Sequence, residues 1–199
     1  MWTIIFSSVS PACENDRVTE GIIRCLLEYF PDAASYADED SGWTPLLYAC
    51  DNKSVTLNII QLLIDAEPDS VSSVDKYGDT PLHVICFNSK VDDETAMQIM
   101  MLLIEKYLEA TRRVDTYGQL PIHLASWKKS PEFCRVLIEA YPESERITQN
   151  NGELPLHRAC EYCNFGTVRY LYNLFPNSIV YNSAWILSNS HSNKRCIYG

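Results

Sequence analysis

Apolar residues recur at helical spacing in five segments of the chain, and each segment stops at a comparable residue. The terminating residues are Pro31, Pro68, Leu108, Pro142 and Pro176. The positions five residues earlier are Leu26, Leu63, Leu103, Leu137 and Leu171, and the positions four and eight residues earlier are also apolar. Such a stripe marks one buried face of a helix, and a proline cannot continue a helix. The pattern therefore predicts five amphipathic helices with a shared core face.

A second pattern lies between these segments. The stretch 77–83 reads Tyr-Gly-Asp-Thr-Pro-Leu-His, and edited copies of it occur three more times. Its prolines are Pro45, Pro81, Pro121 and Pro155, spaced by 36, 40 and 34 residues. Spacings of this length are typical of solenoid proteins, in which one structural unit is repeated along the chain.

Each part of this phrase has a physical role, seen best in the copy at 77–83. Gly78 can take a positive φ, which a sharp turn requires. Thr80 can cap a helix, because its hydroxyl accepts a hydrogen bond from an unpaired N–H of the first turn. Pro81 suits the first helical position, where its missing N–H has no partner to lose. The phrase thus predicts a turn followed by a short helix, so that each repeat is a pair of helices.

The copy at 78–85, Gly-Asp-Thr-Pro-Leu-His-Val-Ile, closely resembles the ankyrin-repeat signature, from which Ile85 departs. Ala49, Ala125 and Ala159 occupy the family's small helix position in the other copies. The resemblance implies an all-α solenoid of stacked helix-turn-helix units, joined by short turns that resemble β-hairpins.

We expect one domain over residues 1–199. Its parts are a capping repeat at 1–38, repeats at 39–74, 75–114, 115–148 and 149–181, and a C-terminal cap or tail at 182–199. In the capping repeat, residues 3–8 align with 45–50 as the first helix, and the polar stretch 11–17 leads to Thr19 as a helix cap. The repeat at 75–114 carries its extra length in a loop at 88–94, which is expected to be exposed and acidic.

The net charge of −10 disfavours nucleic acid, because phosphate backbones need a positive surface. It leaves two readings open, a partner with a basic surface or a solvated acidic face. No apolar run approaches the roughly 18 residues of a membrane helix. The apolar start at 1–9 lacks the basic residues of a secretory signal. We therefore expect a monomer in the cytoplasm or nucleus, without a membrane or nucleic-acid partner.

Three of the eight cysteines, Cys50, Cys86 and Cys160, share one repeat position. Equivalent positions in stacked repeats lie roughly 10 Å apart, too far for a disulfide. We expect reduced cysteines that act as small core residues.

Candidate chemistry is sparse. His83, His123 and His157 belong to the repeated phrase, and the resemblance implies a structural role for them. The alternative is a metal or thiol-redox module at Cys160 and Cys163, which would need a second pair of ligands. The sequence contains no phosphate-binding loop, nucleophile elbow or zinc-protease motif. We expect no cofactor and no catalysis, and the alternative that the chain is a targeting segment of a larger enzyme stays open.

The resemblance implies that the turn tips and the exposed side of each first helix line a concave groove for a partner protein or peptide. The corresponding tip residues are Trp43, Tyr77, Asp79, Tyr117, Gln119 and Glu153. The corresponding helix residues are Tyr48, Phe87, Asn88, Trp127, Lys128, Arg158, Glu161 and Tyr162. Aromatic residues are frequent in this set, and exposed aromatics often anchor protein interfaces. In an alternative interpretation, Tyr77 and Tyr117 only pack between adjacent tips.

Overall fold

The computed structural model describes residues 9–162 and 164–180, and within these ranges the chain is all-α, without strands. Helices occur in pairs. The first helices are α2 (Val9–Glu14), α4 (Pro45–Asp51), α6 (Pro81–Phe87), α8 (Pro121–Lys128) and α10 (Pro155–Glu161). The second helices are α3 (Glu20–Tyr29), α5 (Leu57–Ala66), α7 (Asp93–Lys106), α9 (Pro131–Ala140) and α11 (Phe165–Leu174). Short 3-10 helices follow them at Pro31–Ala34, Pro68–Ser72, Leu108–Arg112, Ser144–Arg146 and Pro176–Val180.

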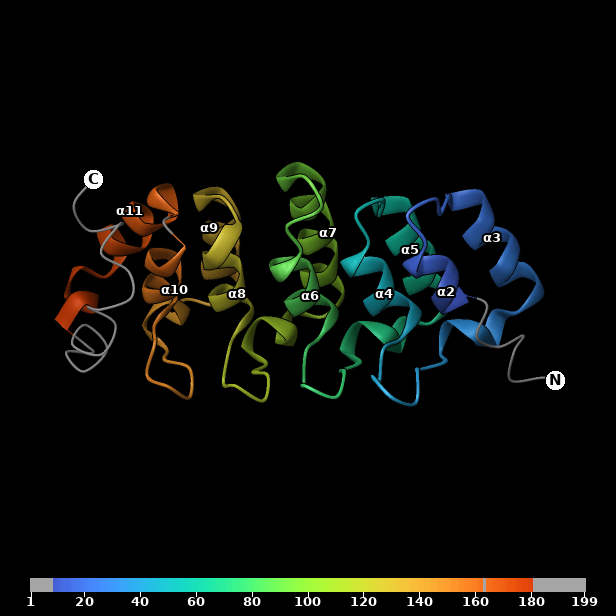
Figure 1. Ribbon diagram of the computed structural model, residues 1–199, viewed down its shortest axis with the longest axis horizontal. Coiled ribbons are helices and arrows are strands. Elements are labelled where there is room, and N and C mark those ends of the chain that lie inside the picture. The colour runs from blue at the N-terminus through green and yellow to red at the C-terminus, as the bar shows by residue number, and fades with distance from the viewer. Residues whose placement is uncertain (1–8, 163, 181–199) are drawn as a thin grey trace. The chain divides into compact units, whose positions relative to one another are not determined.

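The chain divides into two compact units, which we call unit 1 (residues 1–110) and unit 2 (residues 111–199). In unit 1, α4 packs between α2 and α6, while α5 packs against both α3 and α7 (Figure 1). In unit 2, α10 packs on α8 and α11 packs on α9. Within each unit, first helices therefore contact first helices and second helices contact second helices, as stacked repeats require.

The predicted turn and cap chemistry is confirmed. The four glycines of the repeated phrase, Gly42, Gly78, Gly118 and Gly152, have φ between 74° and 83°. Thr44 caps α4 and Thr80 caps α6, each accepting a hydrogen bond from a backbone N–H three residues later. At the tips the backbone turns back on itself. Asp75 N–H donates to the carbonyl of Asp79, and the tip resembles a β-hairpin.

The predicted core stripe is also confirmed at four of its five leucines. Leu63, Leu103, Leu137 and Leu171 are each at most 2% exposed. At the two ends of the described chain the stripe weakens, because fewer repeats cover it. Leu26 is half-buried, and Tyr172 is 41% exposed.

The opening pair differs from the prediction. The expected first helix at 3–8 lies outside the described residues. A helix, α2, occupies 9–14 and overlaps the polar connection that was expected at 11–17. Val9 and Cys13 are fully buried on the side of α2 that meets α4. They are one helical turn apart, but the polar residues between and after them hide this apolar spacing in the sequence. The first part of the polar stretch, residues 11–14, thus belongs to a helix, and residues 15–19 connect it to α3.

The prediction of an exposed acidic loop at 88–94 is only partly right. Helix α7 already begins at Asp93, and the Asp92 carboxylate caps it by accepting a hydrogen bond from Thr95 N–H at 2.9 Å. That backbone hydrogen bond lowers the pKa of Asp92. Val91 is buried beneath the loop. The acidic residues complement the positive end of the helix dipole, so their presence needs no partner.

No described helix is long and apolar enough to cross a membrane. The predicted tail at 182–199 lies outside the described residues, as does Cys163.

Candidate functional site

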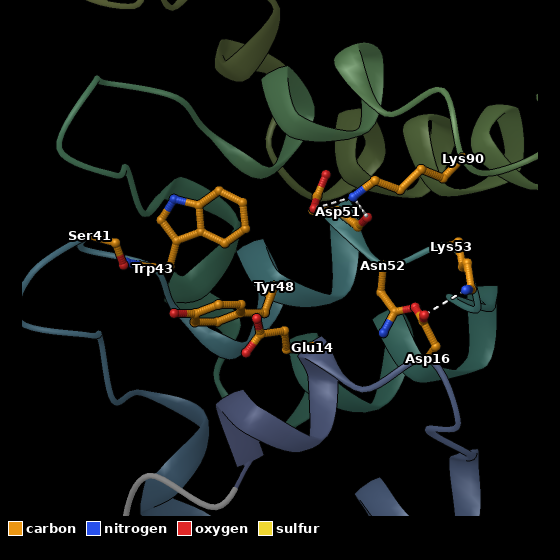
Figure 2. Close-up of a pocket in the computed structure, with 9 residues that line it drawn as sticks. All are labelled: Glu14, Asp16, Ser41, Trp43, Tyr48, Asp51, Asn52, Lys53 and Lys90. Atoms are coloured by element: carbon orange, nitrogen blue, oxygen red, sulfur yellow. Dashed lines mark hydrogen bonds and ion pairs between the residues drawn. The ribbon is translucent and has the colours of Figure 1, made fainter.

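A pocket of about 490 Å³ opens on unit 1 between the first helices and a turn tip. We call it the Trp43 pocket. Figure 2 shows its lining residues, which are Glu14, Asp16, Ser41, Trp43, Tyr48, Asp51, Asn52, Lys53 and Lys90. They come from α2, from the tip before α4, from α4 itself and from the segments that follow α2, α4 and α6. Three successive repeats therefore build one pocket.

Two aromatic rings form one wall of the Trp43 pocket. The rings of Trp43 and Tyr48 meet edge to face with centroids 5.1 Å apart. The indole Nε1–H of Trp43 donates to Asp75 Oδ2 at 3.1 Å, and Asp75 is itself buried. The other oxygen of Asp75 accepts from the N–H groups of Tyr77 and Asp79. The Trp43 ring is thus fixed by the next turn tip, and it presents a preorganised apolar surface.

Four of the five charged groups that line the Trp43 pocket are paired with each other, and the fifth is not. Lys53 Nζ pairs with Asp16 Oδ2 at 2.6 Å, and Lys90 Nζ pairs with Asp51 Oδ2 at 2.7 Å (Figure 2). The exposed carboxylate of Glu14 forms neither an ion pair nor a hydrogen bond with the described residues. Among the described residues, one negative charge of the pocket therefore remains without a counter-charge.

Unit 2 carries a second aromatic group, which we call the Trp127 cluster: Trp127, Lys128, Arg158, Glu161 and Tyr162. The ring centroids of Trp127 and Tyr162 are 4.2 Å apart. The Arg158 guanidinium lies 5.3 Å from the Trp127 ring and 5.7 Å from the Tyr162 ring, while its Nη1 pairs with Glu161 Oε2 at 2.6 Å. Lys128 Nζ lies 4.8 Å from the Trp127 ring. These predicted residues are brought together by α8 and α10.

Other predicted residues lie apart from these two groups. Tyr77, Phe87 and Tyr117 are exposed, between 44% and 59%. Asp79 and Gln119 are half-buried in their turns. Lys76 Nζ lies 5.3 Å from the ring centre of Tyr77. The three aromatics thus remain accessible, but none of them lines the Trp43 pocket.

Two predicted surface residues are buried, so their assignment to the surface is wrong. Asn88 is only 2% exposed because its side-chain N–H donates to the Cys50 carbonyl, 2.9 Å away in the preceding repeat. Glu153 is 7% exposed and accepts a hydrogen bond from the Gln149 side chain across the base of its turn. Both residues hold turns and repeats together.

The two units also differ in charge. Residues 1–110 contain 19 acidic and 6 basic residues, which gives a formal charge of −13. Residues 111–199 contain 7 acidic and 10 basic residues, which gives +3. The net charge of −10 is therefore concentrated in unit 1, the unit that contains the Trp43 pocket.

The repeated histidines take structural positions. His123 is fully buried; its Nδ1 accepts from Leu120 N–H at 3.1 Å, and its Nε2 lies 3.1 Å from the Ile147 carbonyl. Burial lowers the pKa of His123 to about 4, so the imidazole is neutral near pH 7. Thr80 N–H and Leu154 N–H make the same contact with Nδ1 of His83 and His157.

The cysteines offer little chemistry in the described part of the chain. Cys13, Cys25, Cys50, Cys86, Cys134 and Cys160 are all free, without a disulfide. Burial raises the pKa of Cys13 to about 12 and also raises that of Cys50, so neither thiol ionises readily. No group of three metal-ligating side chains occurs among the described residues. The alternative at Cys160 and Cys163 is untested, because Cys163 lies outside them.

Sequence reasoning missed most lining residues of the Trp43 pocket, among them Glu14, Asp16, Lys53 and Lys90. Glu14 and Asp16 were missed because the stretch 11–17 was expected to be a polar connection, whereas its first part belongs to α2. The two lysines could have been found from the repeat phase. Asn52 and Asn88 hold equivalent positions, seven residues after the repeat prolines Pro45 and Pro81. Lys53 and Lys90 follow these asparagines within two residues.

Comparison with known protein families identifies the type of repeat. A family model described as ankyrin repeats (three copies) matches residues 55–146 and 95–183. A search of curated proteins finds no match. Ankyrin repeats are generally protein–protein interaction modules and are typically not catalytic. With its helix pairs, glycine turns and matched repeats, the chain belongs to the ankyrin-repeat family, an all-α repeat solenoid.

Proposed function

We propose that this protein binds a partner protein or peptide, without catalysis, through the aromatic surfaces of its first helices and turn tips. The observation that carries the proposal is the paired aromatics in each unit, Trp43 with Tyr48 and Trp127 with Tyr162. Large, partly exposed aromatic rings are the side chains that contribute most to protein interfaces.

The way these rings are held supports the proposal. The hydrogen bond from Trp43 to Asp75 and the stacking of Arg158 on Trp127 limit ring motion before any partner arrives. Docking onto groups that are already ordered loses little conformational entropy, so a few contacts can give useful affinity.

A selection experiment tests the proposal. A library of random 12-residue peptides displayed on phage is selected on the purified full chain, and the enriched peptides are measured on three variants. We expect Tyr48→Ala or Tyr162→Ala to weaken binding by about tenfold or more, the loss typical of an aromatic anchor. Tyr29→Ala is the matched control, because Tyr29 is 74% exposed on α3 and belongs to neither aromatic group.

Thermal melting of each variant separates lost binding from lost folding. A library that yields no binder, or binders that all three variants retain equally, would contradict the proposed function.

A further inference from the structure

The Trp43 pocket combines aromatic rings with an unmatched carboxylate. The rings of Trp43 and Tyr48 form its apolar wall, and the Glu14 side chain reaches toward Tyr48 from α2 (Figure 2). The faces of aromatic rings carry a partial negative charge and attract cations within about 6 Å. The rings and the carboxylate therefore both favour a cationic occupant.

The other charged groups of the pocket form two ion pairs with each other. Lys53 and Lys90 are held by Asp16 and Asp51 at 2.6 Å and 2.7 Å, so their charges are already compensated. Both pairs are exposed, with side chains 37% to 55% accessible, and exposed pairs are worth little energy. The two pairs cancel in formal charge, so the lining keeps the single negative charge of Glu14, which favours a cation over an anion.

The surrounding unit adds a long-range attraction of the same sign. Its formal charge of −13 raises the local concentration of positively charged segments and speeds their encounter with the surface. The volume of about 490 Å³ is at the scale of sites that enclose small ligands, and it is larger than one side chain requires.

We propose that the Trp43 pocket receives a lysine or arginine side chain of the partner protein, with Trp43 and Tyr48 against its cationic head and Glu14 as its counter-charge. This rests on the proposed function and specifies it. The partner then carries a basic segment, and unit 1 recognises it through one inserted cation.

Short peptides test the pocket without knowledge of the partner. The probes are acetyl-Gly-X-Gly-amide, where X is lysine or arginine, or their uncharged counterparts norleucine and citrulline. Binding is followed by the indole N–H signals in a ¹H–¹⁵N NMR spectrum, with the Trp43 signal assigned from Trp43→Phe. We expect the lysine and arginine peptides to shift this signal in a saturable way, and the neutral peptides to leave it in place.

Glu14→Gln is the decisive variant, because the described residues make no contact that it would break. It should weaken binding of the charged peptides by about fivefold, the loss expected for one exposed charge pair at close range. Glu28→Gln removes the same charge from an exposed site on α3 and should have no effect. Added salt should weaken binding to the wild type more than to Glu14→Gln.

Failure of this inference is distinguishable from failure of the proposed function. A Trp43 signal that stays in place with charged peptides, or that moves equally with norleucine, overturns the cation pocket. If the library peptides still bind through Tyr48 or Tyr162 in that case, the proposed protein-binding function is supported, but the Trp43 pocket does not receive a lysine or arginine side chain.

Discussion

The imidazole of His123 connects two turns of unit 2. Its Nδ1 accepts a hydrogen bond from Leu120 N–H, and its Nε2–H donates to the Ile147 carbonyl 24 residues further along the chain. Both contacts use the neutral ring, and the ring is fully buried. A protonated His123 would place an N–H against the N–H of Leu120 and a charge in an apolar environment.

Acid should therefore destabilise the protein in a defined window. Burial lowers the folded-state pKa of His123 to about 4, whereas an unfolded histidine titrates near about 6.5. The unfolded chain thus binds more protons between these values, and the free energy of unfolding falls as pH decreases from about 6.5 to about 4. We expect His123 to account for about 3 kcal/mol of this loss.

Urea unfolding at several pH values measures the effect. His123→Gln should be less stable at pH 7 but should lose less stability on acidification than the wild type. Equal pH slopes in the two proteins would contradict the assignment, and direct NMR titration of the His123 ring in the wild type gives an independent check.

Asn88 should be a main contributor to stacking in unit 1. Its side-chain amide donates to the Cys50 carbonyl, while its Oδ1 accepts from Lys90 N–H at 2.8 Å. Asn88→Ala would leave a buried carbonyl without its donor, so we expect a loss of about 2 kcal/mol in chemical denaturation. Asn58→Ala is the comparison, because Asn58 also bonds a neighbouring repeat, at Glu20, but at an exposed site. Its loss should stay within about 0.5 kcal/mol, and similar losses in both variants would refute the role of burial.

Gly118 should tolerate no side chain. It has φ +74°, and an added Cβ would overlap Asn150 Oδ1 and lie 2.9 Å from Asn150 N. We expect Gly118→Ala to lower the free energy of unfolding by about 2 kcal/mol or more, since both the backbone and the neighbouring turn must move. Gly21→Ala should have the opposite sign, a gain of about 0.5 kcal/mol, because Gly21 is exposed in α3 and its nearest atom would be 4.0 Å away. A melting temperature that rises in both variants would be inconsistent with the turn geometry.

Local sequence was sufficient to predict the repeats. The turn and cap interactions of Thr80, Pro81 and the turn glycines involve residues at most four positions away. The leucine stripe likewise depends on spacing within one helix. Both features can therefore be recognised from the sequence alone. Helix α2 was not predicted because its two core residues, Val9 and Cys13, have polar neighbours in the sequence and the repeated phrase is absent there.

The candidate sites depend on contacts between repeats, and these were less predictable. Asn88 looks like a surface residue until Cys50, 38 residues earlier, is placed beside it. Glu14 reaches the Trp43 pocket only because α2 packs on α4. In contrast, all five residues of the Trp127 cluster are among the helix positions named from the repeat phase, and their role in binding stays a prediction.

A map of the bound surface tests the central claim most directly. A library-selected peptide is added to the ¹⁵N-labelled full chain, and the backbone and indole signals that move are assigned. The account predicts that the largest shifts belong to the Trp43 pocket or the Trp127 cluster, on the first helices and turn tips. Shifts confined to the second helices α3, α5, α7, α9 and α11 would contradict it.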